Sequence, residues 1–233
     1  MNALEIRDLT KHYTGFSLNH LNLTLPWGCI MGLVGENGAG KSTTIKLILN
    51  TISRDGGTVT ILGRDNRENL CLSKEEIGVV LDEVGISACL TARQVGKIMQ
   101  GIYRSWDEAV FSDYLTRLAV PADKKFKDFS RGMKMKLGIA VALSHHPRLL
   151  ILDEATSALD NESEILVGQS LEKLAHGRTT LTIAHRLTTI KDYDRILVLG
   201  EEGIVEEGTH AQLLEKQGIY YRLWNQLPGE DTL

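Results

Sequence analysis

A glycine-rich segment that ends in lysine and serine is the part of this sequence whose residue types and spacing most directly predict chemistry. The segment GENGAGKS, residues 35–42, fits the pattern GxxxxGK[ST] in full. Glycines allow successive backbone N–H groups to turn toward one anion, and the N-terminus of a following helix adds its dipole. A lysine at this place reaches the β- and γ-phosphates of a nucleotide, and the hydroxyl after it ligates Mg²⁺. The predicted phosphate contacts are Gly35, Asn37, Gly38, Ala39, Gly40, Lys41, Ser42 and Thr43, with Ser42 also a metal ligand.

The elements on either side of this segment test the pattern. CIMGLVG, residues 29–35, has the apolar composition of a buried strand, and KSTTIKLILN, residues 41–50, has apolar residues at helical spacing. A phosphate-binding loop requires a strand before it and a helix after it, and the sequence meets both conditions. The alternative is a glycine turn that matches the pattern by chance, and it does not explain these flanks.

A pair of carboxylates predicts the second half of a phosphate-transfer site. RLLILDEA, residues 148–155, reads as a buried strand that ends in Asp153 and Glu154. Ligands of open α/β sheets bind at the carboxyl ends of the strands. Asp153 is therefore predicted to hold Mg²⁺ through water, and Glu154 to polarise the attacking water. The alternative is an acidic pair on the surface at a strand end.

The remaining sequence predicts an α/β core with a helical insertion. Strand-like runs cover residues 4–9, 17–25, 56–63, 75–83, 179–185 and 195–208. Helical periodicity covers residues 91–103, 105–120, 131–146, 163–177 and 210–227. Ser105 is the expected N-cap of the second of these helices, and the pair His145–His146 is expected to form a solvated helix end.

Composition excludes several classes of protein. The 233 residues carry a formal charge of −4, which gives no general attraction to nucleic acid. Cys29, Cys71 and Cys89 are odd in number and lack metal-binding spacing, so a reducing cytosol is expected rather than a disulfide scaffold or zinc site. The start lacks a signal peptide, and no apolar run reaches the ~18 residues that span a bilayer. Another polypeptide would have to supply any membrane-spanning part.

The chain resembles an ABC-transporter ATPase domain in four segments, which are, in order, GENGAGKST, FSRGMKMKL, LLILDEATSALD and TIAHR. The resemblance covers nearly the whole chain. It implies a P-loop NTPase core of ABC ATPase type, with an antiparallel β subdomain and an inserted α-helical subdomain. Residues 1–233 would form one such domain, with residues 1–85 and 148–233 as the core and residues 86–147 as the helical subdomain. The domain would lie on the cytoplasmic face of a membrane.

The resemblance also implies partners and cofactors. Domains of this family bind two ATP with Mg²⁺ between two copies arranged head to tail, and closure and opening drive attached membrane domains. Each site combines the phosphate loop of one copy with the signature segment of the other, here residues 129–133 with Ser130 and Gly132. A homodimer and a transmembrane transporter subunit are therefore the expected partners, and no nucleic acid is expected.

Three further residues receive roles only through this resemblance. Tyr13 matches the aromatic residue that stacks on adenine, although a tyrosine in the core would fit as well. His185 matches the histidine that contacts the γ-phosphate, with a structural histidine as the alternative. Asp160 ends the segment SALD, which matches the loop that crosses the dimer interface.

The sequence departs from the family pattern at two positions. Arg131 replaces a glycine of the usual LSGGQ signature, where it either adds charge to phosphate binding or crowds the approach. Asp82 replaces the usual glutamine that touches Mg²⁺ and senses the membrane partner. A carboxylate can meet the metal but cannot donate a hydrogen bond as an amide does. These two departures bear on the coupling to a membrane partner more than on the binding of ATP.

The two halves of the chain also resemble different branches of the family. Up to about Glu154, Asp82 and the signature resemble stand-alone ATPase subunits of small bacterial exporters. From ATSALD onward, the chain resembles exporters whose membrane and ATPase domains share one polypeptide. The segment LDEATSALD would be the seam of a recombined or engineered chain, or of a natural mosaic.

The favoured function is an ATP-hydrolysing subunit that powers export through a separate membrane protein. The alternative is a mosaic domain that folds and binds nucleotide without coupled transport, and the altered signature supports it. A third class, the ABC ATPases of translation or DNA repair, typically has tandem domains or long coiled-coil insertions, and neither is present in this sequence.

Overall fold

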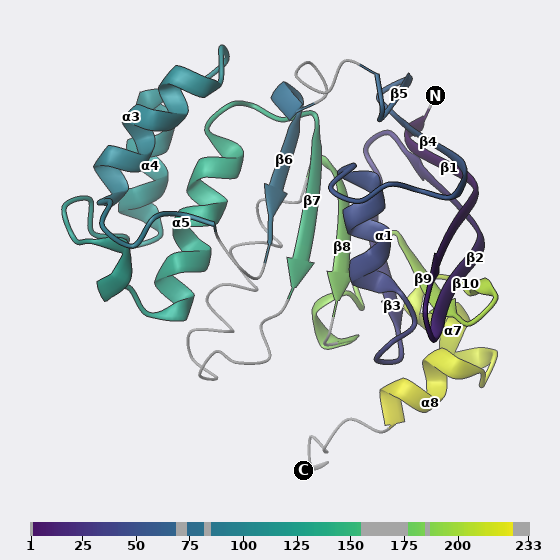
Figure 1. Cartoon of the computed structure of the whole chain (residues 1–233). Helices are drawn as coiled ribbons and strands as arrows, with labels where there is room; N and C mark the ends of the chain where they lie inside the picture. The colour runs from purple at the N-terminus through teal and green to yellow at the C-terminus, as the bar shows by residue number, and fades with distance from the viewer. Residues whose placement is uncertain (1, 69–73, 82–84, 155–176, 185–186, 226–233) are drawn as a thin grey trace, which may run out of the picture. The chain divides into compact units, whose positions relative to one another are not determined.

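The computed structural model describes residues 2–68, 74–81, 85–154, 177–184 and 187–225 (Figure 1). The chain divides into two compact units, of which the first combines Met1–Asn66 with Thr182–Leu233 and the second is Arg67–Leu181. The helix predicted over residues 163–177 lies almost wholly outside the described residues. Every helix within the described ranges is too short or too polar to cross a lipid bilayer.

The first unit contains a four-stranded antiparallel sheet in the order β2-β1-β4-β5. Strands β1 (Asn2–Tyr13), β2 (Phe16–Pro26), β4 (Gly56–Ile61) and β5 (Arg64–Asp65) form it. Strand β1 runs well past the predicted end at residue 9, because it stays paired with β2 up to Tyr13 opposite Phe16. This sheet confirms the predicted antiparallel β part, and its last pair sets Tyr13 opposite Phe16.

The same unit contains the strand that leads into the phosphate-binding segment. Strand β3 (Ile30–Gly35) lies parallel to β9 (Arg195–Gly200), which pairs antiparallel with β10 (Gly203–Gly208). The N–H of Ile30 donates to the Asp194 carboxylate at 2.7 Å, which ties the start of β3 to the start of β9. Helix α1 (Lys41–Ile48) follows, as the sequence predicts.

The predicted helix over residues 210–227 is wrong as a single element. The structure has α7 (His210–Glu215) and α8 (Ile219–Asn225), separated by a turn in which Gln217 is left-handed with φ 51°. The Glu206 carboxylate accepts the N–H groups of Ile219 and Tyr220, and so it starts a second helix. A side chain at position 218 would collide with that carboxylate, so glycine is required there. The break between the helices thus depends on Glu206 of β10, which helical periodicity does not detect.

The second unit places three helices around one apolar cluster. Strands β6 (Ile77–Val80) and β7 (Leu149–Glu154) are parallel. Helices α3 (Ala92–Ile102), α4 (Glu108–Arg117) and α5 (Arg131–Leu143) confirm the predicted helical insertion. The cluster includes Phe111, Leu137, Ile139 and Leu150, each no more than 2% exposed. Strand β8 (Thr179–Ala184) is fully buried and crosses the division between the units.

Helix α4 begins later than predicted. Its N-cap is Asp107, whose carboxylate accepts the N–H of Val110 at 3.0 Å, and not Ser105. The Ser105 hydroxyl donates to Glu75 and lies 2.8 Å from the carbonyl of His145, so its hydrogen-bonding capacity is used by residues distant in sequence. An aspartate N-cap also places a negative charge at the positive end of the helix dipole.

The expected solvated end at His145–His146 is correct only for His146. His145 is 1% exposed, and its ring stacks on Tyr103 with centroids 4.0 Å apart and an interplanar angle of 9°. Its Nε2 lies 3.1 Å from the carbonyl oxygen of Ile77. Burial lowers the pKa of His145, partly offset by its backbone partners and by Glu75.

This burial predicts a loss of stability in mild acid. Because the folded pKa of His145 lies below the ordinary value of about 6.5, the unfolded chain binds a proton that the folded chain refuses. The free energy of unfolding should therefore fall as the pH drops through about 6.5. We expect thermal melting from about pH 7.5 to about pH 5.5 to show a smaller decline for His145→Phe than for the wild type. His146→Gln, at the exposed neighbour, should retain the decline, and equal slopes for all three proteins would contradict the assignment.

Candidate functional site

The glycines of the predicted loop adopt conformations that other residues rarely reach. Gly38 has φ 88° and Gly40 has φ 105°, both in the left-handed region. A Cβ atom on Gly40 would lie 2.9 Å from Cζ of Phe16 and 3.3 Å from Cδ1 of Leu18. The loop therefore needs glycine at Gly40 for its backbone conformation and for its close contact with β2.

Lys41 is folded into the loop it follows. Its Nζ donates to the carbonyl oxygens of Gly35 at 2.7 Å and Glu36 at 3.0 Å, and the residue is only 6% exposed. Both acceptors are in the turn that an anion would enter. The ammonium group is therefore held at the place where phosphate oxygens would bind, beside the exposed Ser42.

The N-terminus of α1 receives no side-chain cap. The N-cap residue is Gly40, and the first turn contains no acidic residue. By contrast, Thr91, Asp107, Ser130 and Thr209 cap α3, α4, α5 and α7 with side-chain oxygens. The first backbone hydrogen bond of α1 is from the N–H of Thr44 to the carbonyl of Gly40, at 2.8 Å. The N–H groups before it face the end of the helix, where the dipole favours an anion.

A hollow of about 500 Å³ opens at this helix end. Its lining consists of Asn37, Gly38, Gly40, Lys41, Ser42 and Thr43, together with Gly15 from the turn before β2 and Phe16 at the start of β2. This size is within the range of pockets that hold small organic ligands. Six of the eight predicted loop residues thus line one space, whereas Gly35 does not line it and Ala39 lines a neighbouring hollow.

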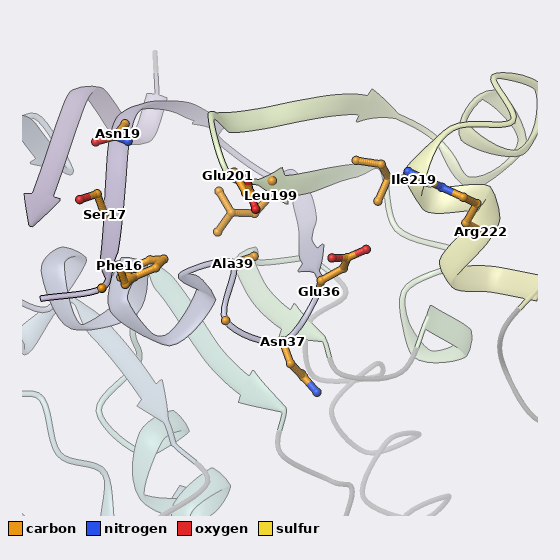
Figure 2. A pocket seen from close by; sticks show the side chains of 13 residues that line it. Phe16, Ser17, Asn19, Glu36, Asn37, Ala39, Leu199, Glu201, Ile219 and Arg222 are labelled. Carbon is orange, nitrogen blue, oxygen red and sulfur yellow. The ribbon is translucent and has the colours of Figure 1, made fainter. Parts of the chain in front are cut away.

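A second hollow of about 620 Å³ lies on the other side of the loop and shares Gly15, Phe16, Asn37 and Gly38 with the first. Figure 2 shows Glu36 and Asn37 extending from the loop, with Arg222 reaching toward the hollow from α8. The charged groups on this side thus come from the loop, from α8 and, with Glu201, from the turn between β9 and β10. Both hollows belong to the first unit.

Phe16 is the site residue that sequence reasoning missed. Its ring lines both hollows and contacts the place where a Gly40 side chain would be. Tyr13, the predicted adenine contact, is 46% exposed and stacks on Phe16 with centroids 6.3 Å apart. The ammonium of Lys11 lies 5.4 Å from the Tyr13 ring centroid. The sequence feature that could have indicated Phe16 is an aromatic residue directly after a glycine, at the start of a strand in which apolar and polar residues alternate.

The signature segment forms the start of α5 in the second unit. Ser130 is the N-cap, and its Oγ accepts the N–H of Met133 at 3.2 Å. Gly132 is buried, whereas Arg131 is exposed. An N-cap hydroxyl that accepts one hydrogen bond can still donate its own proton. The Ser130 hydroxyl can therefore still donate to an anion.

The predicted carboxylates end strand β7. The four residues before them, from Leu149 to Leu152, are each at most 2% exposed, which confirms the buried strand. Asp153 is half-buried with its Oδ1 atom inside the protein, and Glu154 is the last residue of the strand. Asp82, Asp160 and His185 lie outside the described residues.

Comparisons with known proteins agree with this geometry. The family profile described as ABC transporter matches residues 18–157. The chain is 36% identical to an uncharacterized ABC transporter ATP-binding protein of Haemophilus influenzae, over 97% of this chain and 40% of that protein. It is 38% identical to the exotoxin translocation ATP-binding protein PaxB of Pasteurella aerogenes, over 90% of this chain and 31% of that protein.

A solved structure of a bacterial Atm1-family ABC exporter with ATP bound is similar with a TM-score of 0.84 and 27% identity. The match covers 100% of this chain and 43% of that one. The chain therefore spans less than half the length of these relatives.

The close contact at Gly40 predicts the effect of Gly40→Ala on phosphate binding. The added methyl group would displace Phe16 or the loop, in a backbone conformation that costs roughly 1–3 kcal/mol for other residues. We expect calorimetric titration with a nucleoside triphosphate to show affinity lowered about tenfold or more. Gly63→Ala is the matched control, because Gly63 has φ 82° but no atom near its missing Cβ. Unchanged affinity in a folded Gly40→Ala protein would refute the role of this contact.

Proposed function

The chain belongs to the ABC-transporter family, and from this premise we propose that it binds and hydrolyses ATP with Mg²⁺ as half of a head-to-tail dimer. The dimer powers export through a separate membrane protein. The observation that carries the proposal is the uncapped N-terminus of α1, with Lys41 held beside it. A triphosphate supplies the negative charge that this helix end lacks.

Binding exchanges one set of contacts for another. Lys41 Nζ leaves or shares the carbonyls of Gly35 and Glu36 and donates to the β- and γ-phosphates. The N–H groups of residues 38–43 turn toward the same oxygens. Phe16 contacts the sugar or base side of the nucleotide, and Tyr13 extends this aromatic surface.

Hydrolysis uses further residues that the family resemblance assigns. Mg²⁺, where bound, neutralises charge on the phosphates. Ser42, Asp82 and Asp153 are its proposed ligands. An exposed hydroxyl and a half-buried carboxylate are oxygen donors of the kind this ion prefers. Glu154 accepts a proton from the attacking water, and His185 contacts the γ-phosphate.

The signature segment acts on the nucleotide of the other copy. Ser130 holds the start of α5 and donates its hydroxyl proton to the γ-phosphate bound by the partner. Arg131 is exposed beside it and adds a positive charge at the same place. Gly132 contributes backbone, and Asp160 belongs to the loop that crosses the interface.

The names of the relatives support export as the work done. One is described as an exotoxin translocation protein and the matched structure as an exporter. Residues 1–85 and 148–233 form the core and residues 86–147 the helical subdomain that faces the membrane partner. The alternative, a mosaic domain that binds nucleotide without coupled transport, is favoured by Arg131 and Asp82, and a seam at LDEATSALD remains a prediction.

Phosphate release distinguishes hydrolysis from binding alone. We expect the wild-type chain to release phosphate from Mg-ATP, and Glu154→Gln to do so about 10²- to 10⁴-fold more slowly, because its amide cannot accept the proton from water. Both proteins should bind ATP with similar affinity in calorimetric titration. If the wild type releases no more phosphate than the variant, the alternative function is correct.

Dimer formation tests the shared site. Glu154→Gln saturated with Mg-ATP should elute as a dimer in size-exclusion chromatography with light scattering, because the bound nucleotide is not consumed. Adding Lys41→Ala should return it to a monomer, since losing a charged hydrogen bond of about 1.5–3 kcal/mol weakens ATP binding. A strictly monomeric Glu154→Gln protein at high concentration would disprove the composite site.

A further inference from the structure

The far end of α1 is held by the side chain of Asn66, which is 3% exposed and follows β5. Its Nδ2 donates to the carbonyl oxygens of Leu47 at 2.7 Å and Ile48 at 2.9 Å. These carbonyls belong to the last turn of α1, where helices leave acceptors without intrahelical donors. One amide group therefore attaches the end of the helix to the chain that leaves the antiparallel sheet.

Asn66 is itself oriented by a buried charge. Arg54 Nη1 donates to Asn66 Oδ1 at 2.6 Å, and Arg54 Nη2 donates to Asp65 Oδ2 at 2.6 Å. The Arg54 side chain is 6% exposed and that of Asp65 is 29% exposed. The guanidinium fixes which atom of the Asn66 amide faces it, and hence which atom faces the helix. A cation behind the last turn also complements the negative end of the helix dipole.

The helix does not need Asn66 in order to end. Asn50 is left-handed with φ 52°, its N–H donates to the carbonyl of Leu47, and the N–H of Thr51 donates to the carbonyl of Lys46. These local bonds close the helix in the usual way for a left-handed C-terminal residue. What Asn66 adds is a connection between α1 and the β4–β5 strands, and therefore a direction for the helix axis.

We propose that Asn66, oriented by Arg54 and Asp65, positions the phosphate-binding end of α1. The helix has 8 residues, which makes it roughly 12 Å long. The direction of a short helix axis is set by the contacts at its two ends. The loop contacts of Lys41 hold only the N-terminal end. Tilting the released end turns the N–H groups at the other end away from the phosphate oxygens. The proposal rests on the proposed function only in naming ATP as the ligand.

Asn66→Asp tests this role with little change in size. The carboxylate still accepts from Arg54 but faces the two carbonyls of α1 without a hydrogen to donate. We expect the dissociation constant for ATP to rise about tenfold, which corresponds to about 1.4 kcal/mol. In the ligand-free protein, the backbone amide resonances of Gly38 to Ser42 should also move, although Asn66 binds the opposite end of α1.

Asn22→Asp is the matched control. Asn22 also donates from Nδ2 to a carbonyl, that of His20 at 2.8 Å, but it lies on β2 away from α1. It should change neither the ATP affinity nor the loop resonances. If Asn66→Asp does not fold, Asp65→Asn provides the second variant, because it weakens the hold on Arg54 and leaves the Asn66 amide in place. Its shifts should be in the same direction and smaller.

The outcomes separate the two proposals. A folded Asn66→Asp protein with lower melting temperature but unchanged loop resonances and ATP affinity would show that Asn66 serves stability alone, and would overturn the positioning role. Loop resonances that move in the ligand-free variant support positioning even if the wild type fails to bind ATP. A wild-type protein that does not bind ATP would instead refute the proposed function.

Discussion

The N-terminus of α1 favours a negative charge, and its own first turn has neither an acidic residue nor a side-chain cap to supply one. Much of the first unit holds this helix terminus and its loop in place. A helix whose N-cap is a left-handed glycine leaves its first N–H groups directed at the loop. Strand β3 is buried along nearly its whole length, so the loop that follows it starts from a fixed point. Phe16 then fills the side of the loop where any residue larger than glycine at position 40 would be. The binding space results from backbone geometry more than from charged side chains.

The parts of the site that could be predicted from the sequence are those whose physics is local. The glycine positions, Lys41 and Ser42 act through a turn of a few residues, so their spacing in sequence is their spacing in space. Phe16 and Asn66 contribute to the same helix through sheet pairing. Phe16 is placed by the pairing of β2 with β1, where it lies opposite Tyr13, and Asn66 follows β5, which pairs with β4. Neither register is encoded in a pattern that a single sequence displays.

The errors in the sequence-based fold have the same origin. Ser105 was a suitable N-cap by type, but Glu75 and the backbone of His145 use its hydroxyl. Residues 210–227 had continuous helical periodicity, but Glu206 on the neighbouring strand starts a new helix at Ile219. In the first case distant groups occupy the hydroxyl of the expected cap and Asp107 caps the helix instead, and in the second a distant carboxylate starts a new helix. Local propensity located the elements, and tertiary hydrogen bonds fixed their ends.

Under the proposed function, binding and turnover depend on different parts of this chain. Lys41 is already buried against the loop carbonyls, and α1 is held at its far end, so the phosphate-binding loop is organised before any ligand enters. Binding then exchanges the carbonyl partners of Lys41 for phosphate oxygens, while the helix dipole that stabilises their charge is already held in place. The two departures from the family pattern, Arg131 and Asp82, lie in the second unit, away from this loop in sequence. Under the proposed function, changes at those positions affect the coupling to a partner more than the binding of nucleotide to the loop of the first unit.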